Sequence, residues 1–269
     1  MRVGEKIGQG ATADIHAWAP GQVVKLFKAR VPPWLGRHEA RMTHAAFCAG
    51  APAPQMLGEV LVEGRFGIVL TRFDGPTLLQ QLRAGAVTCE QVGAILATLY
   101  RSVHDAPASP ETASLRDWMS AVSGVSADVL PEEIALGVLS LMEDLAAGDR
   151  LCHADLHPGN VIMTAHGPRI IDWACAVRAP AVVDLGRCHV TLSELVPEDA
   201  DPEPPHAINA AVQSEYSRLA GMPRAELTAR MQPYLPILRA LVLLQRRPAS
   251  AGQRQLLIQR IAAALLGRE

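Results

Sequence analysis

The sequence predicts an α+β chain with two lobes, a small β-rich lobe followed by a larger, mainly helical one. The first 70 residues carry short alternating runs separated by glycine turns, as strands do, whereas segments with helical spacing dominate from residue 75 onward. The chain has 269 residues, of which 49% are hydrophobic and 19% charged. It is therefore long and apolar enough for one large domain or two modest lobes around real cores.

The N-terminal elements follow in order. Residues 4–19 (GEKIGQGATADIHAWA) predict two short strands around a glycine turn, and residues 21–28 (GQVVKLFK) predict a third. Residues 37–49 have the apolar spacing of a helix. Residues 56–73 predict two further strands joined at Glu63-Gly64. Together they predict a five-stranded sheet with one helix.

The C-terminal part reads as helices joined by loops. The predicted helices are 88–105, 132–147, 183–195, 206–220, 224–247 and 250–267. Residues 151–173 interrupt them with two short β-like runs, and the proline-rich stretch 196–205 predicts a surface loop. We therefore expect an N-terminal lobe over 1–72, a hinge at 73–76 and a helical lobe over 77–269.

The composition excludes several classes of function. A formal net charge of −2 gives no electrostatic basis for binding nucleic acid or an anionic membrane. With 4% aromatic residues, a stacking platform for single strands is not expected. The five cysteines form no CxxC pair, and the N-terminus lacks the apolar region of a signal peptide. We expect a soluble, cytoplasmic protein with reduced thiols.

The segment LCHADLHPGNVIM, residues 151–163, carries two histidines, an aspartate and an asparagine between apolar ends. A metal cluster is one interpretation, because His153 and His157 are spaced like a helical zinc pair. Pro158 and Gly159 follow at once, however, and would break such a helix.

A structural turn is a second interpretation, but it would not need Asp155 and Asn160 together. Phosphoryl transfer is the third, because it uses a carboxylate beside the acceptor hydroxyl and side-chain oxygens that hold Mg²⁺. Asp155 and Asn160 fit the pattern D-x-x-x-x-N, and Asp172 follows an apolar strand twelve residues later. A hairpin turning at His166-Gly167 would return Asp172 beside Asn160.

The remaining parts of a kinase site lie upstream in the expected order. The glycine turn Gly8-Gln9-Gly10 comes first, then the strand lysine Lys25, then the helical glutamate Glu39.

Three segments now identify a resemblance to a known family. HADLHPGNVIM (153–163) resembles the catalytic loop of the aminoglycoside phosphotransferase and choline-kinase-like family, and IIDWA (170–174) resembles its metal motif. VVDLGR (182–187) resembles the segment that follows, whose aspartate braces the catalytic loop. The resemblance covers nearly the whole chain in order, and it implies the two-lobed fold of protein kinases.

The resemblance also implies roles. Asp155 corresponds to the catalytic base or hydroxyl-orienting carboxylate, and Asn160 and Asp172 correspond to the Mg²⁺ ligands. Lys25 corresponds to the lysine on the α- and β-phosphates of ATP or GTP, and Glu39 to the carboxylate that holds it. His153 and Asp184 support the loop, and for His157 we expect a polar loop position near the site.

The nucleotide would meet two further segments. The loop over the phosphates comprises Gly8, Gln9, Gly10, Ala11 and Thr12. This loop lacks the third glycine of protein kinases, and a Thr12 hydroxyl would substitute for it. The adenine would meet backbone groups where the last strand ends between the lobes, at Leu70, Thr71, Arg72 and Phe73.

The acceptor is predicted to be small. Eleven residues separate Asp172 from Asp184, which leaves no room for the peptide-binding segment of protein kinases, and no A-P-E motif follows. An atypical protein kinase is therefore disfavoured, and the intact motifs argue against a catalytically dead binding module.

The residues 193–203 hold five acidic side chains and no basic one, namely Glu194, Glu198, Asp199, Asp201 and Glu203. Acidic loops in the resembled family line the pocket for cationic aminoglycosides, so Glu198, Asp199 and Asp201 are candidate acceptor-binding residues. This predicts a resistance or self-protection kinase for an aminoglycoside-like acceptor. A solvated loop is the alternative, with acceptors such as a nucleoside or peptide antibiotic, choline or a sugar.

Overall fold

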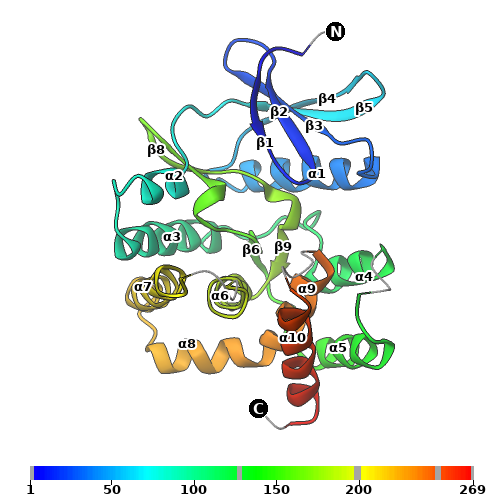
Figure 1. Cartoon of the computed structure of the whole chain (residues 1–269), viewed down its shortest axis with the longest axis vertical. Coiled ribbons are helices and arrows are strands. Elements are labelled where there is room, and N and C mark those ends of the chain that lie inside the picture. Colours follow the sequence, from blue (N-terminus) through cyan, green and yellow to red (C-terminus); the bar gives the residue numbers. More distant parts are fainter. Residues whose placement is uncertain (1–2, 126–128, 197–200, 246–249, 268–269) are drawn as a thin grey trace.

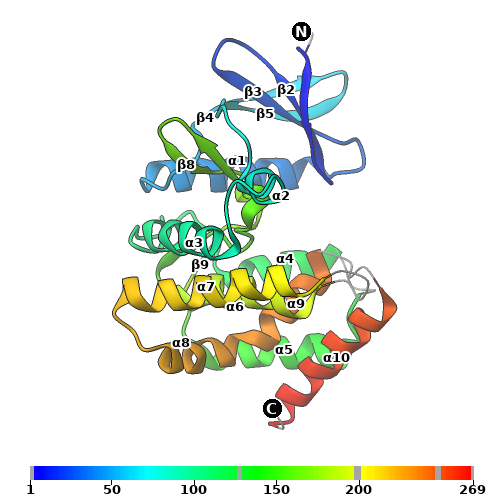
Figure 2. The same cartoon turned by 60° about the vertical axis from the view of Figure 1, so that its left-hand side comes forward.

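The computed structural model describes residues 3–125, 129–196, 201–245 and 250–267, and it has two lobes (Figure 1). A sheet with one long helix forms the N-terminal lobe, and helices form most of the C-terminal lobe. Figure 2 shows the same division from a second direction. The predicted α+β class is therefore confirmed.

The N-terminal sheet is antiparallel throughout and has the strand order β1-β2-β3-β5-β4. Its strands are β1 (Lys6–Gln9), β2 (Ala13–Ala17), β3 (Gln22–Phe27), β4 (Met56–Val62) and β5 (Arg65–Thr71). Helix α1 (Pro33–Cys48) packs against it and begins four residues before the predicted start. Proline suits that first turn because its missing N–H would have no partner there.

The predicted turn between β4 and β5 is present. Val62 pairs with Arg65, which leaves a two-residue loop of Glu63 and Gly64 with φ of 51° and 76°. Positive φ at both positions is what a type I′ hairpin requires, and it matches the twist of the flanking strands.

The C-terminal lobe contains nine α-helices among its described residues. They are α2 (Leu78–Arg83), α3 (Cys89–His104), α4 (Leu115–Val125), α5 (Glu132–Asp144), α6 (Val182–His189), α7 (Glu203–Ala220), α8 (Arg224–Met231), α9 (Leu235–Gln245) and α10 (Ala251–Leu265). Thr77 and Thr88 begin α2 and α3 with capping boxes, in which each threonine side chain accepts from the amide three residues later.

Several helix boundaries differ from the predictions. Helices α2 and α4 were not predicted. The predicted single helix 224–247 is divided into α8, a 3₁₀ turn over Gln232–Tyr234, and α9, because Pro233 and Pro236 lack the N–H that a continuous helix needs. Helix α7 begins at Glu203, inside the predicted loop 196–205. The predicted helix 183–195 is α6 followed by a π-helical turn over Val190–Glu194.

Two short antiparallel strand pairs follow α5 in the C-terminal lobe. Strand β6 (Arg150–Cys152) pairs with β9 (Val177–Ala179), and β7 (Val161–Thr164) pairs with β8 (Gly167–Ile170). Thr164 pairs with Gly167, so the β7–β8 turn is Ala165-His166, one residue earlier than predicted. In the described part of the chain, no helix is long and apolar enough to cross a membrane.

Helices α3 and α7 pack closely at Gly93. A Cβ atom there would lie 2.3 Å from the Ala211 Cβ and 3.0 Å from the Ile208 carbonyl oxygen. The first atom is the Cβ of an alanine and the second is a backbone atom, and both belong to α7. Neither can move aside unless the helix shifts.

We therefore expect Gly93→Ala to lower the free energy of unfolding by about 1–3 kcal/mol, the usual cost of overpacking. Gly137→Ala is the matched control, because its Cβ would meet the flexible end of the Leu265 side chain at 2.7 Å. Both changes gain the same helix propensity, about 1 kcal/mol. Denaturant unfolding of the two variants measures the difference, and equal stabilities would contradict the tight α3–α7 contact.

Candidate active site

Three segments of the chain bring charged side chains together between the lobes. Lys25 lies on β3, Glu39 on α1, and Asp172 two residues after the end of β8. The Lys25 Nζ donates to Glu39 Oε1 at 2.6 Å and to Asp172 Oδ1 at 3.0 Å. The predicted neighbours Lys25 and Glu39 thus form an ion pair, and Asp172 of the other lobe shares the same ammonium group.

The charges of this cluster stabilise one another. Burial alone would lower the pKa of Lys25, but the carboxylates of Asp172 and Glu39 outweigh it, and the pKa of Lys25 is raised. The Lys25 charge lowers the pKa of Asp172, while burial raises the pKa of Glu39 to about 7. Lys25 therefore stays protonated at neutral pH, and Asp172 is the more readily ionised of its two partners.

The β7–β8 hairpin determines the position of Asp172. Val161 pairs with Ile170, and the Ile171 amide donates to the Asn160 carbonyl at 2.9 Å. Asp172 then adopts a left-handed conformation, with φ 65° and ψ 63°, which is uncommon for a residue other than glycine. The hairpin thus places Asp172 beside Asn160, as the sequence predicted, and the strained turn directs the chain away from the strand.

The polar loop after β6 is held by its own side chains. The Asn160 Nδ2 donates to the Asp155 carbonyl at 3.0 Å, and the Asp155 amide donates to His153 Nδ1 at 3.2 Å. The other ring nitrogen of His153 lies 3.1 Å from the Ile171 carbonyl, so a proton on it completes a link to the residue before Asp172. The His157 ring accepts from the Gly159 amide at 3.0 Å and caps the short turn that follows.

Asp184, on α6, is 1% exposed and accepts hydrogen bonds from the loop, as predicted. Its Oδ2 accepts from the His153 amide at 2.9 Å, and its Oδ1 accepts from the Ala154 amide at 2.5 Å. Ala154 has a φ of 56°, a conformation that an alanine retains only when its surroundings impose it. Asp184 supplies this constraint.

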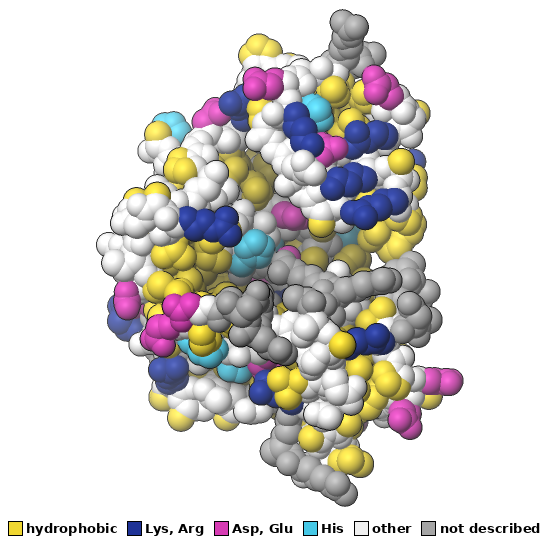
Figure 3. All heavy atoms as spheres, in the orientation of Figure 1, with side chains coloured by type: hydrophobic (Ala, Val, Ile, Leu, Met, Phe, Trp, Pro, Cys, Tyr) yellow, Lys and Arg dark blue, Asp and Glu magenta, His cyan; other side chains and the backbone are white. Residues whose placement is uncertain are grey.

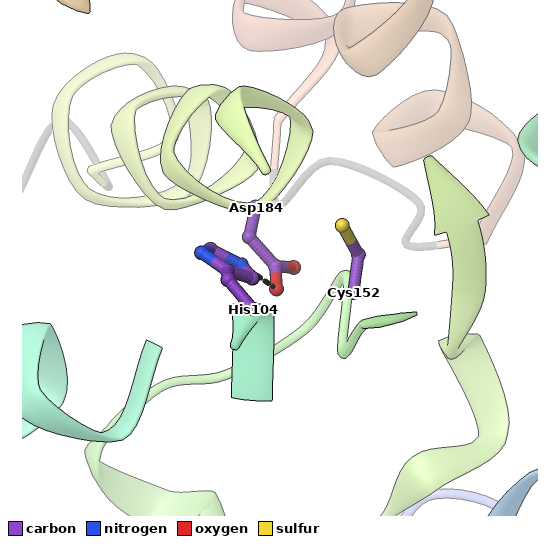
Figure 4. A group of neighbouring side chains, drawn as sticks. All are labelled: His104, Cys152 and Asp184. Atoms are coloured by element: carbon purple, nitrogen blue, oxygen red, sulfur yellow. Dashed lines mark hydrogen bonds and ion pairs between the residues drawn. The ribbon is translucent and has the colours of Figure 1, made fainter. Parts of the chain in front are cut away.

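His104 and Cys152 lie beside Asp184, and the dashed line in Figure 4 joins the His104 ring to the Asp184 carboxylate. His104 Nε2 is 2.9 Å from Asp184 Oδ2, and the Cys152 thiol contacts the Pro180 carbonyl at 3.5 Å. Because the two Asp184 oxygens already accept from the loop and from His104, the group fits a hydrogen-bonded brace rather than a metal centre.

The sequence interpretation missed two side chains of α3 that hold this region. The His104 imidazole contacts Asp184, and the Tyr100 hydroxyl donates to the Leu156 carbonyl at 2.9 Å. The two residues are four apart and so share one helix face. That spacing was the available signal, but their partners lie 56 and 80 residues away in sequence.

Arg187 ends the segment VVDLGR (182–187), but the sequence predicted no role for it. Its Nη2 lies 3.7 Å from Asp155 Oδ1 and donates to Gln245 Oε1 at 3.0 Å, and its side chain is 3% exposed. It follows Asp184 by three residues on α6, so both face the catalytic loop. With Asp155, Thr191 and Leu192 it lines a small pocket.

The predicted phosphate loop is anchored by two cations. Gly8 and Gln9 end β1, and residues 10–12 form the turn to β2. The Lys28 Nζ donates to the Gly10 carbonyl at 2.7 Å, and Arg30 donates to the Ala11 carbonyl at 2.7 Å. The Thr12 carbonyl accepts from the Lys28 amide.

The predicted adenine-binding segment ends β5. The Thr71 amide donates to the Gln55 carbonyl and the Arg72 amide donates to the Gly21 carbonyl. The ring of Phe73 lies under the Arg169 guanidinium, 5.9 Å from its centroid. Leu70 is buried in the sheet, so the backbone around Phe73 is the part of this segment suited to a ligand.

The structure describes the acidic segment 193–203 only in part. Glu198 and Asp199 lie outside the described residues. Asp201 is exposed and accepts from the Glu203 amide at 3.0 Å, which begins α7. The buried Glu194 carboxylate accepts from two cations, Arg239 Nε and Arg260 Nη1, each at 3.0 Å. Glu194 therefore adds no net negative charge to this surface.

Figure 3 shows the face on which these parts meet. A hollow lies between the lobes, with acidic and histidine side chains inside it. Lysine and arginine side chains gather on the N-terminal lobe beside the hollow. This arrangement suits a ligand that carries both phosphate groups and a bound cation.

Comparison with known proteins agrees with the fold. Residues 7–227 match the family described as the phosphotransferase enzyme family. No curated protein matches the chain.

Three of the similar solved structures cover 97–99% of this chain. A putative fructosamine-3-kinase from Haemophilus somnus matches with a TM-score of 0.60, 13% identity and 90% of its own chain covered. The choline kinase LicA from Streptococcus pneumoniae matches with a TM-score of 0.56 and 14% identity, and 94% of its own chain is covered. A mutant of aminoglycoside 2'-phosphotransferase-IIIa in complex with GDP matches with a TM-score of 0.56 and 15% identity, and 90% of its own chain is covered. At these identities the likeness shows the fold.

We expect Asp184→Ala to lower the free energy of unfolding by at least about 3 kcal/mol, because three buried donors lose their acceptor at roughly 1–3 kcal/mol each. The donors are the His153 and Ala154 amides and the His104 ring. Denaturant unfolding measures the loss. Asp144→Ala, at the exposed end of α5, is the control and should change stability by less than about 0.5 kcal/mol. Equal unfolding midpoints for the two variants would show that Asp184 is not a brace.

Proposed function

The chain belongs to the phosphotransferase enzyme family, and from this we propose that it transfers the γ-phosphoryl group of ATP or GTP to a hydroxyl group of a small molecule. The observation that carries the proposal is the Lys25 ammonium held between Glu39 and Asp172. A buried cation whose second partner is a 44%-exposed carboxylate is well placed for nucleotide phosphates.

We assign the nucleotide to the junction of two lobes, 1–72 and 77–269, with a hinge at 73–76. Residues 8–12 would cover the phosphates, because Lys28 and Arg30 hold the Gly10 and Ala11 carbonyls of the turn. The Gly10 amide donates to the Ala13 carbonyl, so the amides of Ala11 and Thr12 are the ones that would face a ligand. The amides of Thr71 and Arg72 already donate hydrogen bonds to carbonyl groups of the N-terminal lobe. The adenine would therefore contact the backbone of Phe73.

Asn160 and Asp172 fit a Mg²⁺ ion by the chemistry of their atoms. The Asn160 amide nitrogen is already a donor to the loop, so its side-chain oxygen is the atom suited to a cation. One Asp172 oxygen accepts from Lys25, and the half-exposed carboxylate retains a second oxygen. Hard oxygen ligands of this kind suit Mg²⁺, which would neutralise phosphate charge during transfer.

Asp155 would orient the acceptor hydroxyl and accept its proton. The acceptor oxygen then forms a bond to the γ-phosphorus while the bond from that phosphorus to the bridging oxygen breaks, leaving ADP or GDP. Arg187 contacts the Asp155 carboxylate and holds it in place, and Asp184 holds the backbone of the same loop. Such positioning is the main contribution that a protein makes to this reaction.

For the acceptor we propose an aminoglycoside-like compound first, which would make the chain a resistance or self-protection kinase. The acidic character of residues 198–203 supports it. Fructosamine, choline and aminoglycoside kinases share this fold, so the fold is compatible with several acceptors.

A second candidate is an uncharged hydroxylated acceptor such as a nucleoside antibiotic. Two observations favour it. Arg187 places a cation 3.7 Å from the Asp155 carboxylate, and Glu194 is neutralised by Arg239 and Arg260. A polycation would gain nothing from these groups.

A panel of hydroxylated antibiotics and metabolites, incubated with ATP or GTP and Mg²⁺, tests the proposal by mass spectrometry. We expect one member of the panel to gain one phosphoryl group. Phosphorylation of protein substrates without any small acceptor would contradict it.

We expect Asp172→Asn to lower kcat by about 100-fold or more, the scale on which a single electrostatic contact to the reacting groups acts. The variant should remain folded, because the side chain keeps its shape and is partly exposed. Steady-state kinetics at saturating Mg²⁺ measure the loss. Glu143→Gln, an exposed change on α5, is the control and should retain the wild-type rate. Near-normal turnover by Asp172→Asn would show that this residue is not part of the active site.

The triple variant Glu198→Gln, Asp199→Asn, Asp201→Asn separates the two acceptor classes. With an aminoglycoside-like acceptor we expect KM for the acceptor to rise several-fold, because desolvated pairs with its ammonium groups are lost. KM for ATP should not change, which provides the internal control. An unchanged acceptor KM would favour the uncharged class.

A further inference from the structure

A second cavity lies in the C-terminal lobe, between α3, α6, α7 and α8. Its volume is about 460 Å³, which is within the range of sites for small organic ligands. Its lining comes from the start of α6, the end of α7, α8 and the 3₁₀ turn before α9, whereas Asp155 and Asn160 come from the loop after β6. In Figure 2 the connection from α7 to α8 lies at the left-hand end of this lobe.

The wall of the cavity is mainly apolar. Met222, Leu227 and the rings of Tyr216 and Tyr234 contribute to it. Tyr216, Leu227 and Tyr234 are buried, so their positions are determined by the packing of the lobe rather than by solvent. The Tyr234 hydroxyl donates a hydrogen bond to the Ala146 carbonyl at 3.1 Å. A preformed apolar wall of this kind favours the hydrocarbon part of a ligand.

Two of the eleven lining residues are charged, and both are arginines, Arg101 and Arg230. Arg101 pairs with Asp105 at 2.5 Å and Arg230 with Glu226 at 2.6 Å, each along one exposed helix face. Ion pairs between exposed side chains contribute little, so the guanidinium groups can turn to a ligand at small cost. Asp105 and Glu226 themselves do not line the cavity. The charge offered to an occupant is therefore positive.

Tyr216 connects this wall with the catalytic loop. Its hydroxyl is 2.9 Å from His104 Nδ1, and His104 Nε2 is 2.9 Å from Asp184 Oδ2. The Asp184 carboxylate in turn accepts from the amides of His153 and Ala154. The tautomer of His104 that carries its proton on Nε2 donates to the Asp184 carboxylate and accepts the Tyr216 proton at Nδ1. These members are all buried, so the chain of hydrogen bonds runs through packed interior.

We propose that this cavity binds a small amphiphilic anion, an apolar chain or ring with one carboxylate or sulfonate group. The apolar part packs against Tyr216, Leu227 and Met222, and the anion pairs with Arg101 and Arg230. An occupant holds the Tyr216 hydroxyl on His104 and thereby steadies the loop that carries Asp155. The binding part is independent of the proposed function, whereas the effect on the rate rests on it.

Calorimetric titration of the full chain with decanoate tests the binding. Decanol and decyltrimethylammonium, with the same chain length, are the matched probes. We expect one decanoate per chain, bound at least about five-fold more tightly than either probe, as expected where charge complements the site. Arg230→Gln should remove that preference and leave decanol binding unchanged. Absence of decanoate binding, or equal binding of the three probes, would overturn the proposal.

Filling the cavity locates the site. We expect Ala220→Phe, at the end of α7, to abolish decanoate binding, because the ring would occupy the space. Met222→Trp, after the end of α7, is a second filling variant should the first fail to fold. Leu136→Phe, on an exposed position of α5, is the control and should bind decanoate normally. Normal binding by a folded filling variant would place the ligand elsewhere and contradict the proposal.

Tyr216→Phe tests the connection to the loop, since it keeps the ring but removes the hydroxyl. We expect it to bind decanoate with wild-type affinity. In the wild type, decanoate should slow hydrogen exchange of the His153 and Ala154 amides several-fold and raise kcat without changing KM for the nucleotide. Neither effect should occur in Tyr216→Phe. Hydrogen exchange does not require turnover, so it can be measured even if the protein lacks the proposed kinase activity. Equal exchange rates with and without decanoate would refute the connection.

Discussion

The carboxylate of Asp184 is the constraint on which the catalytic loop depends. It lies at the start of α6 with both oxygens buried, and the amides of His153 and Ala154 donate to it. Ala154 adopts a left-handed conformation there, which the loop would not retain without these bonds. An unpaired buried carboxylate would be costly, so the loop and α6 must meet in this one way. The position of Asp155 follows from that contact.

Lys25 has a comparable role between the lobes. Its ammonium joins Glu39 on α1 with Asp172 from the C-terminal part. A desolvated cation needs partners, so the interaction fixes the distance between β3, α1 and the end of β8. The same charge lowers the pKa of Asp172 and keeps that carboxylate ionised. The parts that would contact a nucleotide and its metal are thus placed by one ion-pair network.

The charges near Asp155 weaken the argument that the acidic residues 193–203 attract a cationic acceptor. Glu194 looks available in the sequence but is buried against Arg239 and Arg260. Arg187 brings a positive charge to Asp155 from α6. Local charge counts therefore overstate how strongly this surface attracts cations, because pairing across helices cancels part of the charge. The acceptor class depends on residues that approach Asp155 in space, not on the composition of one loop.

The sequence by itself determined the two-lobed class, the Glu63-Gly64 hairpin and the hairpin that brings Ile171 against Asn160. Each of these depends on contacts between near neighbours, where alternation, turn chemistry and loop length leave few options. The tertiary structure alone decided that His104 reaches Asp184, that Tyr216 reaches His104, that Arg187 contacts Asp155 and that a cavity forms beside Tyr216. These contacts join residues separated by 32 to 112 positions, and they depend on how α3, α6 and α7 cross. Helical periodicity shows which face of a helix is buried, but not which distant side chain that face meets.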